Sequence, residues 1–309
     1  MRFLRKSYTY FYDALDGNRW GKKILIGIPY VWLSIFFLLP LLIIFKVSLS
    51  DSILGIPPYK DLIEWIPSIS RLKIYFSFEN YIILFEDGIY RYALMQSLNL
   101  ASISTIFCLL LGYPMAYAIC QAKEKIQTLL LLLVLLPFWT SFLLRVYAWI
   151  GLLSKEGTLN KILMWLGLIQ NPESFIGTNF SICLGMVYCY LPFMILPLYT
   201  TLSKFDTSLL EAAADLGCPP FKRFFKITLP LSMAGIIAGC LLVSIPCVGE
   251  FVIPELLGGE KSYVLGKVIW VEFFHNRDWP IASTIAIFMI VFMVLPIIFF
   301  QRIHDRHRT

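Results

Sequence analysis

Six long apolar runs constrain this chain more than any other feature of its sequence. A helix that rises about 1.5 Å per residue needs roughly 20 residues to cross about 30 Å of hydrocarbon, and each run has about that length. The runs therefore predict an all-α membrane protein with six transmembrane helices. They are Ile24–Phe45, Leu94–Cys120, Thr128–Leu153, Phe180–Thr201, Ser232–Leu256 and Ile281–Phe300.

Composition supports a bilayer as the natural solvent of the chain. Of its 309 residues, 58% are hydrophobic and only 15% are charged, with a mean hydropathy of +0.74. So little charged surface could not cover a water-facing globule, which excludes an ordinary cytosolic protein. The first run is longer than the apolar core of about 7–15 residues in a signal peptide, so we expect an uncleaved helix.

The positions of the basic residues predict the orientation of these helices. One side of the membrane would hold 15 lysines and arginines, in segments 1–23, 121–127, 202–231 and 301–309, and the other side 9. Because cytoplasmic loops are enriched in lysine and arginine, both termini are expected in the cytoplasm. The net charge of +6 thus reflects topology rather than nucleic-acid binding. The predicted parts are a cytoplasmic tail at 1–23, a six-helix domain at 24–300 and a basic cytoplasmic tail at 301–309.

The longest predicted outer loop spans residues 49–93. It contains Pro57-Pro58, an amphipathic stretch at Tyr59–Ile66 and the segment Phe78–Tyr81. We expect small helices here that lie over the outer face. Long loops are often functional, and a docking surface and a simple lid over the helices are both compatible with this sequence.

The predicted cytoplasmic loop 202–231 has the signals of a helical hairpin. A polar residue at 206–208 can cap a first short helix, and Gly217 can end it. A second short helix can begin at Pro220 and end before Pro230. From local physics alone, such a hairpin could simply connect two spans.

Specific identities in this loop resemble a known family. Glu211-Ala212-Ala213, then Gly217, then Ile227-x-Leu229-Pro230 resembles the "EAA" loop in the integral membrane subunits of bacterial ABC importers. The resemblance is closer to the polyamine branch of these permeases. It extends there to the runs Leu136–Trp149, Gly249–Gly259 and Asn276–Pro280.

This resemblance implies a function and a set of partners. It implies the type I ABC importer permease fold in a bacterial inner membrane, with a path for putrescine or spermidine. The partners would be a second permease subunit, two copies of a cytoplasmic ATP-binding subunit and a periplasmic polyamine-binding protein. A coupling helix would contact the ATP-binding subunit through Glu211, Ala212, Ala213, Asp215 and Gly217. A permease for another small organic cation or solute and an ion-coupled secondary transporter are the alternatives.

Motifs of catalysis are absent from the sequence. It contains no G-x-x-x-x-G-K-[ST] phosphate loop, no H-E-x-x-H and no G-x-S-x-G. We therefore expect no enzyme activity, no metal and no cofactor in this chain, with ATP hydrolysis in a separate subunit.

Two charges fall inside apolar runs, Arg145 in the third and Glu250 in the fifth. A charge at the bilayer centre costs roughly 2.5–3.5 kcal/mol on insertion scales, so such residues usually face protein or water. If both helices are straight, the two side chains share a layer about 25 Å from the cytoplasmic end. One reading is an intramembrane ion pair between them. A second is that Glu250 lines the path and attracts a cationic substrate, and a third is simple exposure of these charges to water on the outer side.

Local sequence around Glu250 favours a broken helix. Pro246, Gly249 and Pro254 interrupt the fifth run, and broken helices at membrane depth usually line a cavity or are buried in protein. Gly235-x-x-x-Gly239 gives the same run a small face for close packing. Aromatic rings could add cation–π attraction along the path; the candidates are Trp139, Tyr147, Tyr188 and Tyr190.

Overall fold

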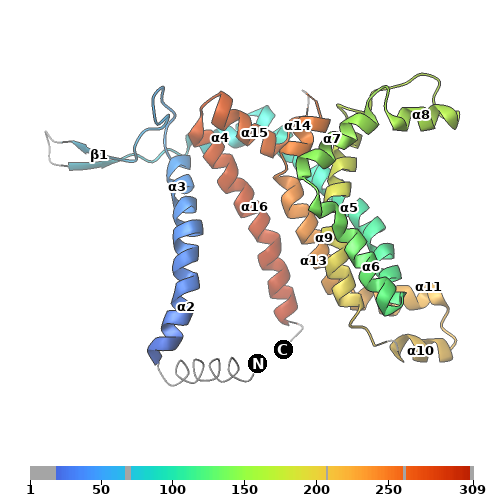
Figure 1. The fold of residues 1–309 in the computed structure, drawn as a ribbon. Coiled ribbons are helices and arrows are strands. Elements are labelled where there is room, and N and C mark those ends of the chain that lie inside the picture. The colour runs from blue at the N-terminus through green and yellow to red at the C-terminus, as the bar shows by residue number, and fades with distance from the viewer. Residues whose placement is uncertain (1–18, 67–70, 207, 260–261, 307–309) are drawn as a thin grey trace, which may run out of the picture. The chain divides into compact units, whose positions relative to one another are not determined.

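The computed structural model describes residues 19–66, 71–206, 208–259 and 262–306. The chain divides into two compact units. The first comprises Met1–Tyr81 with Asp278–Ile287, and the second comprises Ile82–Arg277 with Phe288–Thr309. Helices dominate the described residues of both units (Figure 1).

The first unit contains one long apolar helix and the loop that follows it. Helix α2 (Arg19–Leu33), the π-helical turn η1 (Ser34–Leu38) and α3 (Leu39–Ser48) follow one another without a break. The last carbonyl groups of a helix lack intrahelical partners. The side-chain amide of Asn80 donates to the carbonyls of Ser48 (3.2 Å) and Ser50 (2.8 Å), which closes this end.

The predicted outer loop contains a β-hairpin as well as a helix. Strand β1 (Ile63–Ile66) pairs antiparallel with β2 (Arg71–Ile74), with Ile63 opposite Ile74. The helix expected over Tyr59–Ile66 is therefore wrong, because its isoleucines and tryptophan favour a strand once a second strand can pair with it. A short helix beside Phe78–Tyr81 is confirmed by α4 (Glu79–Glu86).

Three long helices form the centre of the second unit. They are α5 (Gly88–Gln121), α9 (Asn179–Leu202) and α13 (Met233–Val248). The side chains of Asp87 and Thr178 accept backbone N–H groups at the first turns of α5 and α9. Such capping satisfies donors that a helix cannot pair internally, and it explains why these helices begin where they do.

Glycines set the close approach of α13 to α9. A Cβ atom on Gly235 would lie 2.6 Å from the Thr201 hydroxyl, and one on Gly239 would lie 2.6 Å from the Met194 sulfur. Both distances are too short for a real side chain. The small packing face predicted from Gly235-x-x-x-Gly239 is therefore confirmed.

The third apolar run is not one straight helix. It forms α6 (Glu124–Leu135), a 3₁₀ turn η2 (Leu136–Trp139) and α7 (Phe142–Leu153), with α8 (Thr158–Trp165) beyond it. Glu124–Trp139 and Phe142–Trp165 are bent by 89°. Pro137 in the turn has no N–H group to continue the helix. The estimate that Arg145 lies about 25 Å along a straight helix therefore does not apply.

The fifth apolar run is broken where its sequence predicted. Helix α13 ends at Val248, residues 249–251 are not helical, and the short helix α14 (Val252–Leu257) follows. The remaining described elements are helix α15 (Leu265–Trp270), the π-helical turn η4 (Val271–His275) and α16 (Trp279–Arg306).

The loop 202–231 folds as a helical hairpin. Its first arm is α10 (Ser208–Asp215). Its second arm comprises α11 (Pro220–Arg223), the π-helical turn η3 (Phe224–Thr228) and α12 (Leu229–Leu231). The expected end before Pro230 is wrong, because the wider π turn leaves room for a proline that lacks an N–H group. We call this segment the α10–α12 hairpin.

Length and composition identify four unbroken helices that could cross a membrane: Leu25–Ser48, Gly88–Gln121, Asn179–Leu202 and Trp279–Ile298. Two bent pairs pass the same test together. They are Glu124–Trp139 with Phe142–Trp165, and Pro220–Leu231 with Met233–Val248, which are bent by 65°. The described part of the chain therefore offers four spans, or up to six if each bent pair crosses once.

Candidate functional site

Glu250 lies in the break between α13 and α14, and only 8% of it is exposed. Its Oε1 atom accepts the backbone N–H groups of Val252 (2.9 Å) and Ile253 (3.3 Å), so the carboxylate caps α14. Its Oε2 atom accepts the hydroxyl of Tyr190 on α9. A buried carboxylate with donors on both oxygens keeps its charge at lower cost than an isolated one.

Helix α15 covers the turn that carries Glu250. A Cβ atom on Gly266 would lie 2.6 Å from the carbonyl oxygens of Gly249 and Glu250, so only glycine permits this approach. The ring of Phe251 stacks on Trp270, with centroids 5.2 Å apart and planes at 21°. The break is thus held between α9 and α15, and Phe251, one ring of the stacked pair, directly follows Glu250 in the sequence.

Arg145 lies in the first turn of α7, in a different environment from Glu250. Its Nε and Nη1 atoms are buried and have no hydrogen-bond acceptor in the described part of the chain. The guanidinium carbon lies 5.2 Å from the ring centre of Phe138 and 5.6 Å from that of Phe142. These are cation–π distances. A groove of about 350 Å³ opens beside Arg145, with walls from α7 and from Tyr188.

Aromatic rings connect the surroundings of Arg145 to those of Glu250. Phe138 meets Phe193 edge to face at 5.2 Å between centroids, and Phe193 lies 6.2 Å from Tyr190. No ion pair joins Arg145 to Glu250 among the residues that the structure describes. In this arrangement the Glu250 oxygens accept from Tyr190, Val252 and Ile253 instead. An Arg145–Glu250 pair in another conformation stays a prediction.

The four aromatic candidates occupy different positions relative to Glu250. Tyr190 is buried and bonds the carboxylate. Tyr188, two residues earlier on α9, points about 200° away and packs edge to face on Trp149 at 5.4 Å. Trp139 and Tyr147 are exposed in this chain by 81% and 55%. The structure therefore brings only Tyr190 of these four into contact with Glu250.

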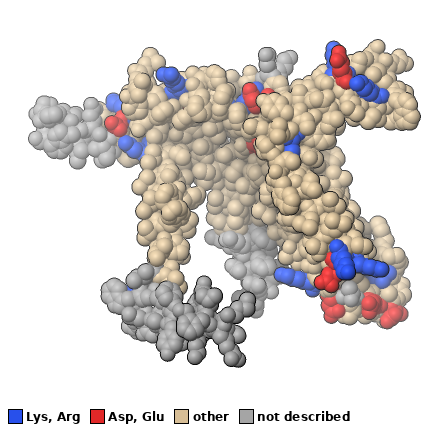
Figure 2. All heavy atoms as spheres, viewed as in Figure 1, with Lys and Arg blue, Asp and Glu red and all other residues tan. Residues whose placement is uncertain are grey.

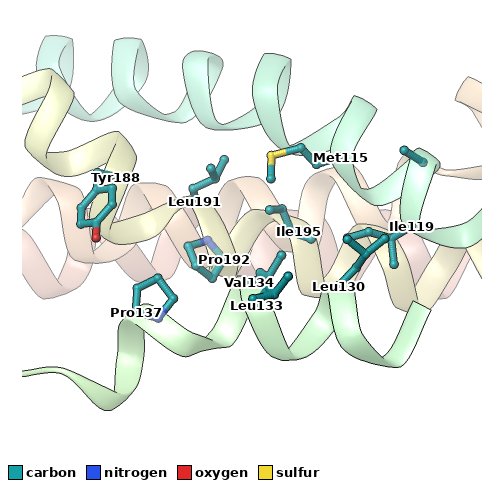
Figure 3. Close-up of a pocket in the computed structure, with 11 residues that line it drawn as sticks. Met115, Ile119, Leu130, Leu133, Val134, Pro137, Tyr188, Leu191, Pro192 and Ile195 are labelled. Carbon is teal, nitrogen blue, oxygen red and sulfur yellow. The ribbon is translucent and has the colours of Figure 1, made fainter. Parts of the chain in front are cut away.

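An apolar cavity of about 400 Å³ lies between α5, α6 and α9. In Figure 3, Met115 and Ile119 from α5, Leu130 and Leu133 from α6, and Ile195 from α9 point into this space, with Tyr188 at one end. Tyr188 also lines the groove beside Arg145. The apolar cavity and the groove beside Arg145 therefore share Tyr188 as a common wall.

The first arm of the α10–α12 hairpin ends in a closed hydrogen-bonded turn. Gly217 has a φ of +73°, which L side chains adopt at a cost. The N–H groups of Gly217 and Cys218 donate to the carbonyls of Ala214 (2.8 Å) and Ala213 (3.0 Å). This pattern is the Schellman motif. The role predicted for Gly217 as the residue that ends the helix is confirmed.

The other end of α10 is capped by Asp206, one of the residues considered for this role. Its carboxylate accepts the Ser208 N–H at 3.0 Å. Hydrogen bonds from the Ser208 side chain and then from its backbone hold the pKa of Asp206 below its usual value. The second arm is tied back through Arg223, whose Nη1 donates to the carbonyl of Leu210 at 3.2 Å.

The hairpin presents a mixed surface. Glu211, Ala212, Asp215 and Gly217 are exposed, and Ala213 is half-buried. Leu216 and Phe221 are 87% and 77% exposed, so apolar side chains stand beside the charges. Figure 2 shows acidic and basic side chains gathered over this part of the second unit.

Sequence reasoning missed Phe193 and Trp270. Phe193 lies between Phe138 and Tyr190, and Trp270 stacks on Phe251 next to Glu250. The sequence marks neither, because aromatic residues are frequent throughout the apolar runs. Phe251 follows Glu250 directly and was the one local signal of an aromatic surface there.

Comparison with known proteins gives a consistent family. Residues 14–309 match the family described as binding-protein-dependent transport system inner membrane component. The spermidine/putrescine transport system permease protein PotB of Haemophilus influenzae is 40% identical over 285 residues, covering 92% of this chain and 94% of that protein. The protein of the same name from Escherichia coli strain K12 is 43% identical over 233 residues, covering 75% of this chain and 84% of that protein.

A solved structure shows the same fold at lower identity. A bacterial ABC transporter involved in the import of the acidic polysaccharide alginate contains a chain that is 18% identical, with a TM-score of 0.68. The match covers 93% of this chain and 96% of that one. The helical arrangement is therefore shared with ABC importer permeases.

Proposed function

The chain belongs to the binding-protein-dependent transport system inner membrane components, and we propose that it is a permease subunit of a polyamine importer. With a second permease subunit it forms the path for putrescine or spermidine. The observation that carries this proposal is the 40% identity to a spermidine/putrescine permease over 92% of the chain. The fold shared with an alginate importer supports the class of transporter but not the substrate.

The proposed topology has six spans with both termini in the cytoplasm. Four unbroken apolar helices and two bent pairs support the number. The excess of lysine and arginine in segments 1–23, 121–127, 202–231 and 301–309 supports the orientation. In this topology the β1–β2 hairpin and α4 belong to the periplasmic loop 49–93, and the α10–α12 hairpin faces the cytoplasm.

The α10–α12 hairpin is the proposed contact with a separate ATP-binding subunit, present in two copies in the importer. Exposed Leu216 and Phe221 support this role, because apolar side chains beside charges are typical of surfaces that dock on another protein. ATP hydrolysis occurs in that subunit. The Schellman turn at Gly217 keeps α10 in a fixed shape, so that force on the hairpin reaches α13.

The Glu250 turn is the proposed substrate contact. The carboxylate offers the negative charge that an ammonium group needs, and Tyr190 already donates one hydrogen bond to it. A substrate ammonium would take the place of the Tyr190 hydroxyl. The neighbouring Phe251 and Trp270 rings would add cation–π attraction of about 0.5–2 kcal/mol.

Transport requires two conformations that differ in affinity for the substrate. In the proposed cycle, ATP binding draws the two ATP-binding subunits together and moves the α10–α12 hairpin. The helices attached to it then open the path toward the periplasm, where a binding protein delivers the polyamine. Hydrolysis returns the path to the cytoplasmic side.

Reconstitution tests this function directly. The chain is co-expressed with a second permease, an ATP-binding subunit and a periplasmic binding protein, and uptake of labelled putrescine and spermidine into proteoliposomes is measured. We expect uptake that requires internal ATP and the binding protein. Uptake by this chain alone, driven by an ion gradient, would contradict the proposal, as would transport of other solutes with polyamines excluded.

A further inference from the structure

A cation without an acceptor lies at the groove beside Arg145. We call this feature the Arg145 groove and define it by Arg145, Leu144, Ala148, Trp149 and Tyr188. Among the described residues, the buried side-chain atoms without a hydrogen-bond partner are Nε and Nη1 of Arg145. A guanidinium stays charged in proteins and carries only donors, so these N–H groups need an acceptor.

Within the described part of the chain, the surroundings of Arg145 do not supply that acceptor. Phe138 and Phe142 face the guanidinium, and their rings attract its positive charge. Neither ring has an oxygen or nitrogen atom that could accept a hydrogen bond from the guanidinium N–H groups. Glu250 is engaged by Tyr190 and the N-terminus of α14. Phe138 itself packs edge to face on Phe193, another group without an acceptor oxygen in its side chain.

The face of α7 beside Arg145 is shaped for a protein helix. Ala148 and Gly151 are three residues apart and both exposed, and nothing lies within 4 Å of the position that a Cβ on Gly151 would take. Residues three apart lie on the same face of a helix, and small residues on such a face permit the close approach of a second helix in a membrane. A lipid chain packs equally well on large apolar side chains, so lipid contact alone does not explain small residues at these two positions.

We propose that the Arg145 groove receives a segment of the second permease subunit that carries an aspartate or glutamate, and that this carboxylate pairs with Arg145. The proposal rests on the proposed function, which requires a second permease. Charge complementarity selects the carboxylate, since its two oxygens match the donor geometry of a guanidinium. The Ala148/Gly151 strip selects a helix as its carrier.

Photo-cross-linking tests the occupant of the groove in the intact complex. Benzoylphenylalanine is introduced in place of Leu144, which lines the groove and is 66% exposed, with Trp165 on α8, which is 84% exposed, as the control position. After illumination in membranes, we expect an adduct between this chain and the second permease at position 144. A phospholipid adduct at position 144, or no protein adduct there, would overturn the proposal.

Charge exchange tests the carboxylate. Arg145→Glu is expected to lower the amount of second permease that co-purifies with this chain by about tenfold or more, because it leaves two like charges in contact. One Asp→Arg or Glu→Arg substitution in the second permease should restore it. Arg91→Glu, at an exposed arginine of α5, is the matched control and should have no effect.

Restoration identifies the pair even if Arg145→Glu alone folds poorly. Failure of every Asp→Arg and Glu→Arg substitution in the second permease to restore assembly overturns the proposal. The proposed function is judged separately, by the unmodified complex. If the unmodified chain assembles and transports polyamine but position 144 does not cross-link to the second permease, the inference fails and the function stands.

Discussion

Two sets of donors meet at the Glu250 carboxylate. The backbone of α14 holds one oxygen in place, and the Tyr190 hydroxyl bonds the other. The first set belongs to the fold, because it is built into the turn that ends α13. The second comes from a separate helix and can be exchanged for another donor. In the proposed function, this division would let one carboxylate hold its turn and still bind a passing cation.

Replacing Glu250 by glutamine tests this view. Glu250→Gln keeps an acceptor for the α14 N–H groups but removes the charge. Since a hydrogen bond to a charged group contributes about 1.5–3 kcal/mol, we expect polyamine uptake to fall by about tenfold to hundredfold while assembly is retained. Uptake is measured with labelled putrescine, and assembly by co-purification of the partner subunits.

The control for this variant is Glu173→Gln, at an exposed glutamate of the loop 154–179. It should leave uptake unchanged. The alternative of an Arg145–Glu250 pair makes a different prediction: Glu250→Gln and Arg145→Gln would then each impair assembly, and the double variant would be no worse than either. Unchanged uptake in Glu250→Gln would exclude this residue from the path.

At the scale of elements, the α10–α12 hairpin depends on the backbone conformation of Gly217. Its φ of +73° allows the Schellman bonds that end α10 and reverse the chain. A left-handed conformation costs a residue with a Cβ roughly 1–2 kcal/mol. The cost is small for the whole protein but acts at the turn that orients the hairpin surface.

Gly217→Val and Gly217→Asn form a matched pair at this turn. Valine is branched at Cβ and disfavours positive φ, whereas asparagine tolerates it. We expect Gly217→Val to abolish most of the ATPase stimulation by the loaded binding protein, and Gly217→Asn to retain most of it. ATPase activity of the reconstituted complex is the measurement. Equal stimulation in both variants would show that the hairpin does not transmit the signal.

Of the two breaks in the apolar runs, the sequence predicted one and missed the other. The break after Val248 is visible in the sequence, because Pro246, Gly249, Glu250 and Pro254 cluster there. The break at Leu136–Ser141 was missed, since Pro137 is a lone signal within a continuous apolar run. The hairpin of β1 and β2 was missed because strand formation depends on a second strand several residues away.

At the scale of the whole molecule, orientation in the membrane is the property that the uneven basic charge predicts. Lys155 lies in the loop 154–179 and Lys204 at the α10–α12 hairpin, and both are exposed. Cysteines placed there should be labelled from opposite sides.

The labelling uses a membrane-impermeant maleimide on spheroplasts, with Cys218→Ser as the background. Lys155→Cys should react in intact spheroplasts, and Lys204→Cys only after the membrane is permeabilised. The reverse result would invert the topology and remove the α10–α12 hairpin from any cytoplasmic partner. Equal labelling of both would place them on the same side and indicate an even number of crossings between them, so that Asn179–Leu202 would not cross the membrane on its own.

The sequence by itself determined that the chain belongs in a lipid bilayer and where its apolar runs lie. It also determined the break at Glu250 and the end of α10 at Gly217. These features depend on local chemistry: apolar length, prolines, and a glycine that tolerates positive φ. Motif spacing in the loop 202–231 was enough to indicate the family, because the matching residues lie within about 20 positions of one another.

Only the tertiary structure decided which side chains meet. A membrane helix is apolar on all sides, so its sequence does not specify how it is rotated about its axis. That rotation turns Tyr190 toward Glu250 and Tyr188 toward the Arg145 groove. It also brings Phe193 against both Phe138, which faces Arg145, and Tyr190, which bonds Glu250.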